Sequence, residues 1–415
     1  MTSPRRLRVA LLTYRGHPHV GGQGVYVHYL SRALAELGHS VEVFSGQPYP
    51  ELAEGVGLTR VPSLDLYRPD DPFRRPRRAE LRGPADVLEY GLMCCGSFPE
   101  PLTFSLRVAL ALAARRGDFD VVHDNQCLGY GLLSVARDVP LVATVHHPIT
   151  VDRDLAVAAA PDALERSRLR RWYGFTRMQG RVARRLPRLL AVSAASRADV
   201  ARAFGCPEHA IGVVHNGVDP GLFRPLDEVR RVPGRVIAMV SADLPMKGVV
   251  HLVEALAKVR TERPADLVLA GKGADSPAIR AAARRYGVED AIRFAGRVDK
   301  LELVGLYAES QVAVVPSLYE GFSFPAVEAM SCGVPLVATT GGALPEVAGT
   351  GGETALLVAP GDAGALASAI GRLLDDERLR ARLARAGRAR VLERFTWRSA
   401  AEATVDEYRR VPARC

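Results

Sequence analysis

Residues 312–335 read VAVVPSLYEGFSFPAVEAMSCGVP, and this stretch decides which fold the sequence predicts. The run VAVVPS (312–317) is short, apolar and rich in β-branched residues, which favours a buried strand. Pro325 suits the first turn of a following helix, because the N–H that proline lacks would be unpaired there anyway. The intervening EGFSF (320–324) is therefore predicted to be a turn at the carboxyl end of a strand, immediately before a helix.

The same order of strand, loop and helix recurs along the chain. Strands that alternate with helices indicate parallel sheets covered on both faces, so the predicted fold class is α/β with two doubly wound, Rossmann-like domains. The other strand-like runs are RVALLTY (8–14), SVEVFSG (40–46), DVVHDN (120–125), PLVATVHH (140–147), LLAVSAAS (189–196), RVIAMVSA (235–242), ADLVLAGKGA (265–274), IRFAGRV (292–298) and PLVATT (335–340).

The length of 415 residues also favours two domains, because one hydrophobic core rarely spans so many residues. We expect the boundary near NGVDPGLFRPLDEVRRVPG (216–234), which is rich in proline and glycine and has little periodicity. This gives domains of 1–216 and 217–396. Ligands of open α/β sheets bind outside the carboxyl ends of the strands, so the two domains are expected to face each other across a cleft.

Two arginine-rich helical stretches, 363–394 and 397–410, end the chain. Thr396 is in position to cap the second of them.

The composition, with 48% hydrophobic and 24% charged residues, is that of an ordinary globular protein. Its 55 lysines and arginines against 46 acidic residues give a net charge of +9. That excess favours an anionic partner such as a phosphorylated substrate, a lipid surface or a nucleic acid. The arginine content can equally reflect a GC-rich genome, and both interpretations stay open.

The six cysteines show neither a CxxC pair nor a Cys/His ligand spacing, which fits a reducing compartment. We expect the adjacent Cys94 and Cys95 to be small core residues. The basic start, MTSPRRLRVALLTYRG, has too short an apolar run for a signal peptide. No apolar stretch in the sequence approaches the roughly 18–20 residues of a membrane span. The sequence therefore predicts a cytoplasmic protein.

Glu320 lies at the start of the predicted turn, and Glu328 about one turn into the helix. Carboxylates accept pairs of sugar hydroxyls, and the free N–H groups of a turn and a helix N-terminus suit hydroxyls or anions. Either glutamate alone is explained by a turn cap or a solvated helix residue. The whole string of residues is not, and it predicts a binding site.

EGFSFPAVEAMSCGVP (320–335) resembles the E-x7-E segment of the retaining GT-B glycosyltransferases of family 4. The likeness covers nearly the whole chain, and the separate motifs are weak singly but specific together. The other segments that resemble the family, in the expected order, are GGQGVYVHYLSRALAELGHSVEVFSG (21–46), TVHH (144–147), AVSAAS (191–196), VVHNGVDPGLF (213–223), KGVVHLVEAL (247–256), LAGKG (269–273) and GALPEV (342–347).

The resemblance implies a GT-B fold in which the first domain serves the acceptor and the second holds a nucleotide-sugar donor. The C-terminal helix, 397–415, would pack back on the first domain. Glu320 would contact the donor sugar ring and His146 would lie beside the reacting sugar, so these two are the catalytic candidates. Lys247 would pair with the diphosphate, and Glu328 would hold the ribose hydroxyls. The other donor-binding candidates, which act chiefly through backbone groups, are Gly21, Gly22, Gly321, Phe322, Ser323, Phe324 and the stretch from Gly296 to Val298.

One segment departs from the family pattern. Where the family reads G-R-x-x-x-x-K-G, this chain reads SADLPMKG (241–248), with Ser241 and Ala242 in place of glycine and arginine. Alanine supplies neither charge nor hydrogen-bond donor for a diphosphate. Either another cation such as Arg297 replaces the arginine, or Lys247 and the backbone hold the leaving group alone.

Three weaker signals indicate other kinds of site. GGQG (21–24) lacks the G-x-G-x-x-G spacing of a dinucleotide-binding loop, and the second strand ends without an acidic residue. DRD (152–154) matches the D-x-D with which some glycosyltransferases hold a cation, although its arginine would oppose that cation. His146 and His147 are adjacent, so on a strand they face opposite ways and cannot share one metal. We therefore expect no cofactor and no metal.

ERSRLRRWYGFTRMQGRVARRLPRLL (165–190) contains nine arginines with three aromatic residues interleaved. It predicts either a solvated helix face or a surface for anionic lipid or for a phosphate-bearing acceptor. Nucleic acid is disfavoured, because no nucleic-acid-binding module accompanies the stretch.

The sequence thus predicts a retaining, metal-independent glycosyltransferase with a UDP- or GDP-linked donor. The acceptor is open, with lipid-linked or phosphate-bearing molecules among the candidates. The enzyme would be cytoplasmic, with or without peripheral attachment to the inner face of the membrane. The rival hypothesis, which Ala242 motivates, is a non-catalytic relative that binds a nucleotide or nucleotide sugar as a partner protein.

Overall fold

The computed structural model describes residues 5–16, 22–68, 70–240 and 245–411. These residues form two compact units. Unit 1 consists of Met1–Val214 with Ala400–Cys415, and unit 2 of His215–Ser399.

Unit 1 is built on a seven-stranded sheet in the order β3-β2-β1-β4-β5-β6-β7. All neighbouring strands are parallel. The strand order reverses between β1 and β4, which makes the carboxyl end of this pair the topological switch point. The strands are β1 (Arg8–Thr13), β2 (Ser40–Ser45), β3 (Gly57–Arg60), β4 (Val121–Asn125), β5 (Leu141–Val145), β6 (Arg188–Ala191) and β7 (Ile211–Val213).

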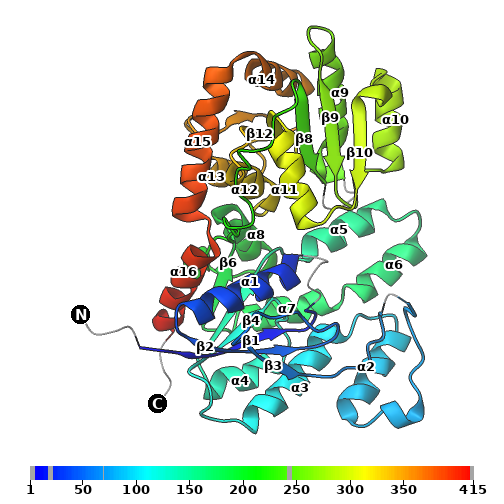
Figure 1. Cartoon of the computed structure of the whole chain (residues 1–415). Coiled ribbons are helices and arrows are strands. Elements are labelled where there is room, and N and C mark those ends of the chain that lie inside the picture. The colour runs from blue at the N-terminus through cyan, green and yellow to red at the C-terminus, as the bar shows by residue number, and fades with distance from the viewer. Residues whose placement is uncertain (1–4, 17–21, 69, 241–244, 412–415) are drawn as a thin grey trace. The chain divides into compact units, whose positions relative to one another are not determined.

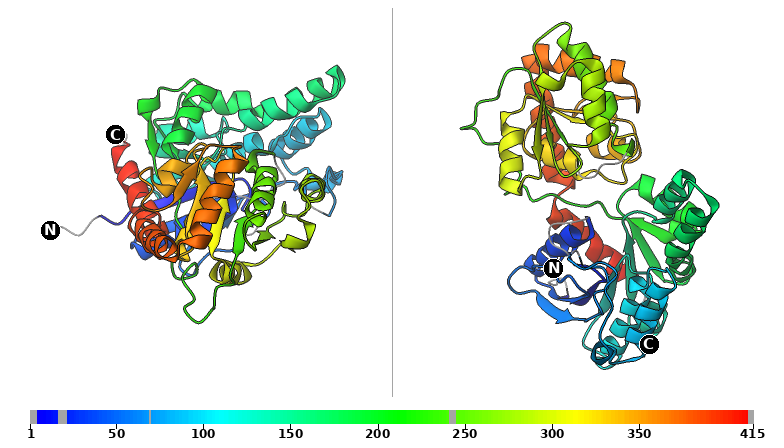
Figure 2. Two further views of the ribbon diagram at one scale, coloured as in Figure 1. Left: turned by 90° about the horizontal axis from the view of Figure 1, so that it is seen from above. Right: turned by 90° about the vertical axis from the view of Figure 1, so that its right-hand side faces the viewer.

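Helices cover both faces of this sheet (Figures 1 and 2). Alternate residues of a strand point to opposite faces, so Ala10 and Leu12 of β1 join the core beneath α3, α4 and α7, whereas Val9 and Leu11 face the other side. The helices of this unit are α1 (Gly22–Glu36), α2 (Pro84–Cys94), α3 (Glu100–Ala113), α4 (Leu132–Asp138), α5 (Thr150–Ala159), α6 (Ala163–Trp172), α7 (Phe175–Ala183) and α8 (Ala194–Phe204), with short 3-10 turns at Arg78–Glu80 and Glu208–Ala210.

Unit 2 repeats the scheme with six strands in the order β10-β9-β8-β11-β12-β13, again parallel throughout. Its switch point lies between β8 and β11. The strands are β8 (Arg235–Met239), β9 (Asp266–Ala270), β10 (Ile292–Gly296), β11 (Val312–Val315), β12 (Leu336–Thr339) and β13 (Leu356–Val358). The helices are α9 (Val249–Arg260), α10 (Pro277–Tyr286), α11 (Lys300–Glu309), α12 (Phe324–Ser331), α13 (Leu344–Ala348), α14 (Ala363–Asp375) and α15 (Glu377–Arg394), with 3-10 turns at Pro245–Lys247 and Glu289–Ala291.

The last helix, α16 (Trp397–Arg410), packs on unit 1 from Ala400 onward, as predicted. Its Tyr408 hydroxyl lies 2.7 Å from Nδ1 of His123 on β4, and Glu407 pairs with Arg188 of β6 at 2.7 Å. The helix begins with the predicted cap, because Thr396 Oγ1 accepts from the Ser399 N–H at 3.1 Å.

Three details of the sequence prediction need correction. The stretch 363–394 is two helices, because Asp376 ends α14 and its carboxylate accepts from the Leu379 N–H to start α15. Cys94 and Cys95 are exposed rather than buried. The strands β3, β7 and β13 were not predicted, and each has only three or four residues.

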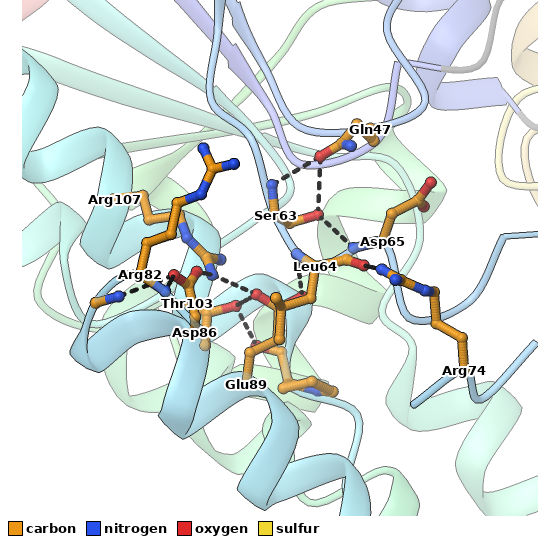
Figure 3. Close-up of polar contacts among 12 residues, drawn as sticks. Gln47, Ser63, Leu64, Asp65, Arg74, Arg82, Asp86, Glu89, Thr103 and Arg107 are labelled. Atoms are coloured by element: carbon orange, nitrogen blue, oxygen red, sulfur yellow. Dashed lines mark hydrogen bonds and ion pairs between the residues drawn. The ribbon is translucent and has the colours of Figure 1, made fainter. Parts of the chain in front are cut away.

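A buried ion-pair cluster fixes the chain that follows β3 (Figure 3). The Glu89 side chain is fully buried, and Arg107 pairs with it at 2.5 Å and with Asp86 at 2.6 Å. Burial raises the pKa of Glu89, while Arg107 acts in the opposite direction. Glu89 also accepts from the Leu64 N–H at 3.3 Å, which ties α2 to the segment beyond β3. Removing one member of such a pair leaves an uncompensated buried charge and costs about 3–5 kcal/mol.

Candidate active site

Two loops meet at the switch point of unit 2. One follows β8 and carries Lys247, and the other follows β11 and carries Glu320. The Leu318 N–H donates to the Met246 carbonyl at 2.7 Å, which joins the loops directly. Gly248 has φ +66°, and a Cβ there would collide with the carbonyl oxygen of Pro316. A glycine at 248 is therefore required for this close approach.

Lys247 and Glu320 form an ion pair at this junction, with Nζ 2.8 Å from Oε1. The Ser317 hydroxyl donates to the same carboxylate oxygen at 2.7 Å. Both charged side chains are mostly but not fully buried, at 23% and 12% exposure. The structure thus brings together two of the sequence-predicted site residues that lie 73 positions apart.

The backbone around Glu320 is fixed from both sides. Its carbonyl oxygen accepts from the Ala343 N–H at 2.8 Å, and Gly342 (φ +62°) lies so close to that oxygen that a Cβ would collide with it. Ser323 has φ +96°, an unfavourable conformation for a residue with a side chain, and its hydroxyl accepts from the Ala326 N–H to cap α12. Pro325 stands in the first turn of α12, as predicted. Strained backbone of this kind persists where its surroundings over-determine it, often at functional sites.

Glu328 lies one turn into α12 and is half-buried. Removal from water raises the pKa of its carboxyl to about 7, while Lys300 acts in the opposite direction. A carboxylate in such a position gains when ligand hydroxyls replace the lost water.

In unit 1, His146 follows β5 and lies at the edge of a polar cluster. Its Nε2 is 2.6 Å from Oδ1 of Asn125, whose amide nitrogen in turn donates to the Gln23 carbonyl at 3.3 Å. Since an amide oxygen only accepts, Nε2 must carry the proton and donate, which leaves Nδ1 as an acceptor. The Tyr26 ring packs edge-on against the imidazole, with 4.6 Å between ring centroids. Burial lowers the pKa of His146 to about 4, so the ring is neutral at pH 7.

Gln126 holds the backbone beside this histidine. Its side-chain oxygen accepts from the N–H groups of His146 at 2.6 Å and His147 at 3.3 Å, and its amide nitrogen donates to the His147 carbonyl at 2.5 Å. Gln126 itself has φ +57°, just past the end of β4. The sequence analysis did not predict a role for Asn125 or Gln126, because DVVHDN was assigned only as a strand. The polar residues at the end of that strand, which lies at the switch point, could have indicated a site.

A second histidine belongs to the same polar cluster. His123 is fully buried on β4, with Nε2 2.7 Å from Thr144 Oγ1, and that hydroxyl lies 3.1 Å from the Tyr26 hydroxyl. Burial lowers the pKa of His123 to about 3, and His146 acts in the same direction. The two histidines are therefore neutral together at pH 7.

Family models match almost the whole chain. The model described as Glycosyltransferase Family 4 matches residues 20–222, and the model described as Glycosyl transferases group 1 matches residues 227–390. The MMP alpha-(1->4)-mannosyltransferase of Mycolicibacterium hassiacum is 53% identical over 410 residues, which cover 98% of this chain and 99% of that protein.

This chain is a GT-B glycosyltransferase of family 4. The D-inositol 3-phosphate glycosyltransferase 2 of Catenulispora acidiphila is also similar, at 30% identity over 97% of this chain and 95% of that protein. The sucrose-phosphate synthase of Thermosynechococcus elongatus shares the fold, with a TM-score of 0.71 at 23% identity over 97% of this chain and 98% of that one. Anabaena HepE, solved with UDP and glucose, gives a TM-score of 0.67 at 18% identity over 98% of this chain and 100% of that one.

Several other predicted donor-site positions of the glycosyltransferase lie in unit 1, elsewhere in unit 2 or outside the described residues. Gly21, Ser241 and Ala242 lie outside the described residues, while Gly22 is the first residue of α1. Gly296 (φ +66°) ends β10 at a register shift, and its carbonyl accepts from the Gly271 N–H at 2.6 Å. Arg297 is exposed, and within the described ranges no hydrogen bond or ion pair joins it to Lys247 or Glu320.

The DRD segment of the glycosyltransferase lies on α5, where residues two apart point in different directions. Asp152 is 3.5 Å from His147 Nε2, whereas Asp154 pairs with Arg153 at 2.8 Å. This geometry does not present the two carboxylates to one cation. In the part of the chain that the structure describes, no three histidine, cysteine or acidic side chains gather as metal ligands. Nor is any helix there both long enough and apolar enough to cross a membrane.

Proposed function

We propose that this glycosyltransferase moves a hexosyl group from a nucleotide-diphosphate sugar to an acceptor, with retention at the anomeric carbon and without a metal ion. The name of the 53%-identical relative makes mannose the first sugar to test. UDP and GDP are the first nucleotides to test, UDP because a protein of the same fold, HepE, was solved with it. The division of labour follows the resemblance: 217–396 holds the donor and 1–216, with the C-terminal helix, serves the acceptor.

The Lys247–Glu320 pair is the observation that carries the proposal. When the glycosidic bond of the donor breaks, negative charge develops on the leaving diphosphate and positive charge on the anomeric carbon. Because the two side chains lie 2.8 Å apart, one lysine and one carboxylate can address the two ends of that bond. Preorganised charges aimed at developing charge are commonly the largest catalytic term in an enzyme.

The rest of the donor has partners around α12. Glu328 would accept from the ribose hydroxyls, and its desolvated position favours such a ligand over an isolated charge. The N-terminus of α12 and the backbone of Gly321, Phe322, Ser323 and Phe324 offer N–H groups to sugar or phosphate oxygens. Gly22, the first residue of α1, and the preceding Gly21 would approach the distal phosphate, and Val298 would contact the base.

His146 would contact the donor sugar as a neutral group. Its Nε2–H is engaged by Asn125, and among the described residues no hydrogen bond reaches Nδ1. Nδ1 is therefore available to accept from a sugar hydroxyl. A neutral imidazole adds no positive charge next to an anomeric carbon that is itself becoming positive.

Metal independence is proposed on the same grounds. Lys247, the backbone N–H groups and the helix N-terminus can neutralise the leaving diphosphate. Turnover is therefore expected to be unchanged by EDTA. Complete loss on chelation, restored by magnesium or manganese, would contradict this part of the proposal.

A panel of nucleotide sugars tests the function as a whole. GDP-mannose, UDP-glucose and their parent nucleotides would be screened by thermal shift, because a bound ligand raises the melting temperature by mass action. Donors that bind would then be assayed for slow hydrolysis and for transfer to mannoside acceptors, with the anomeric configuration of the product read by NMR. A protein that binds a donor but neither hydrolyses nor transfers it would be the non-catalytic relative.

We also propose a cytoplasmic location with peripheral attachment to anionic membranes through α6. This helix buries none of its residues, and its arginines Arg168, Arg170 and Arg171 are exposed. Each arginine near an anionic surface adds about 1 kcal/mol at low salt. Co-sedimentation with anionic liposomes should weaken when Arg166, Arg168, Arg170 and Arg171 become glutamine; unchanged binding would reduce α6 to a solvated face.

A further inference from the structure

Two adjoining cavities open on the helical side of unit 1. The larger, about 570 Å³, lies among α5, α7 and α8, and the smaller, about 390 Å³, lies among α5, α6 and α7. Arg153, Asp154, Thr176 and Arg177 line both. Figure 1 shows α5 and α6 running side by side on this part of the unit. We call the joined cavities the arginine groove; its cationic residues are Arg153, Arg170, Arg177, Arg181, Arg184 and Arg202.

Carboxylates do not balance this charge. Among the described residues that line the groove, two are acidic, and each pairs with an arginine: Asp154 with Arg153 at 2.8 Å and Asp199 with Arg202 at 3.1 Å. Four arginines remain without a carboxylate among the groove residues. A concave surface lined by charge of one sign attracts counter-ions, so these arginines favour an anionic ligand.

The four arginines without a carboxylate partner in the groove differ in their hydrogen bonds. Arg181 donates to the Tyr130 hydroxyl at 3.0 Å, and Arg184 donates to the Phe204 carbonyl. In the described ranges, neither Arg170 nor Arg177 has a side-chain hydrogen bond or ion pair. Arg177 lies in both cavities, so its guanidinium is free to serve a ligand in either.

We propose that the arginine groove is a binding site for a phosphate ester. Guanidinium groups match phosphate oxygens with parallel N–H bonds, and arginine is the residue of choice for that geometry. A cavity of this volume has the size of small-ligand sites and can hold a phosphorylated sugar unit. None of its residues is among the donor-site candidates: the groove is lined by residues of unit 1, whereas Lys247 and Glu320 belong to unit 2.

The phosphate can come from a soluble phosphorylated acceptor or from a lipid headgroup. A cavity lined by several helices favours the former, because a planar membrane reaches exposed α6 residues such as Arg168 and Arg171 more readily than a cavity between helices. The proposal does not depend on the nature of the donor, and its test is a binding measurement.

The test uses the whole chain and two double variants of equal charge. Arg177→Gln/Arg181→Gln removes two groove cations, while Arg382→Gln/Arg385→Gln removes two exposed cations from α15 in unit 2. Inorganic phosphate and glucose 6-phosphate are titrated by calorimetry, with and without a saturating amount of UDP or GDP, whichever the thermal-shift screen shows to bind, so that the donor site is read separately. Vesicles of phosphatidylcholine with and without phosphatidylglycerol form the third arm. Thermal melting checks that both variants are folded.

We expect the groove variant to weaken phosphate and glucose 6-phosphate binding about tenfold or more, as the loss of charge-assisted hydrogen bonds implies, with binding of the screened nucleotide unchanged. The α15 variant should bind as the wild type does. Equal weakening in both variants would mean that only net charge matters, and it would overturn the proposal. So would unchanged phosphate binding, or a loss confined to phosphatidylglycerol vesicles, which would assign the groove to the membrane surface.

Discussion

The two units use the same switch-point position of the same kind of sheet, but they place opposite kinds of chemistry there. In unit 2 the site is charged, with Lys247 paired to Glu320 and Glu328 one helical turn away. In unit 1 it is neutral, with an uncharged imidazole that donates to the amide of Asn125 and a backbone N–H that donates to the amide of Gln126.

Under the proposed function, the difference follows from the ligand that each site would bind. A diphosphate that gains charge needs a cation and N–H groups, and a charged pair near the surface can provide them. A sugar hydroxyl needs only a well-placed acceptor, and burial supplies this by keeping His146 neutral. The comparison predicts that unit 2 variants act through charge and have large effects, whereas unit 1 variants act through geometry and have smaller ones.

The largest effect is expected at Lys247. Lys247→Gln keeps a hydrogen-bonding group but removes the charge beside the leaving diphosphate, so kcat/KM should fall by about 10³-fold. Lys258→Gln, on the exposed side of α9, is the matched control and should be close to wild type. Steady-state kinetics with the donor identified by screening measures both. Similar losses in the two variants would remove Lys247 from the site.

Glu320 and Glu328 should fail in different ways. Glu320→Gln removes a charge that interacts with the developing positive charge at the anomeric carbon, so kcat should fall about 10²-fold. Ribose contacts are made equally in the ground and transition states, so Glu328→Gln should mainly raise the donor KM. Losses confined to KM in both variants would show that Glu320 only binds.

The strength of the local sequence pattern explains how much of the fold could be predicted from the sequence alone. The strands that were predicted lie in buried runs such as VAVVPS, which are recognised by their apolar, β-branched composition. The missed strands β3 and β13 are short and have no buried residues, so they show no core-facing pattern. Their place in the sheet is set by pairing with a neighbouring strand: β3 pairs with β2, and β13 pairs with β12.

The site residues also divide into those that a local sequence pattern shows and those that it does not. Glu320 and Glu328 share one local segment, which the sequence shows directly, whereas the Lys247–Glu320 contact joins loops 73 residues apart. The neutral site was harder still to predict. Asn125 and Gln126 have no motif of their own, and their role depends on how β4 and β5 lie side by side in the sheet.

The neutral site is tested at Asn125, where a smaller effect is expected. Asn125→Ala removes the acceptor that orients the His146 ring, and kcat/KM should fall about tenfold, the size of one lost buried hydrogen bond. Asn125→Asp restores an acceptor but adds charge, so activity should return while the pKa of His146 rises from about 4. The pH profile of kcat then separates orientation from mere packing. If alanine and aspartate behave alike, the histidine needs no such positioning.

The smallest effect is expected from a change of pH. It tests whether the carboxyl of Glu328 is ionised before the donor binds. Burial raises the pKa of Glu328 to about 7, so the carboxyl is largely protonated below that value and ionised above it. Ribose hydroxyls need both carboxylate oxygens as acceptors, so the donor KM should fall a few-fold as pH rises through 7, and Glu328→Gln should abolish that dependence.

The stability of the unliganded protein should decrease over the same rise in pH. Because folding raises this pKa above its usual value, ionisation favours the unfolded chain, and the stability contributed by the neutral carboxyl is present below about pH 4.5 and lost as pH rises through 7. Glu328→Gln should therefore raise the melting temperature of the unliganded protein at pH 8 but not at pH 4.5. A KM that ignores pH between 6 and 8, together with an unchanged melting temperature at pH 8, would mean that Glu328 is already ionised and solvated without ligand, and the site in unit 2 would then resemble an ordinary charged surface.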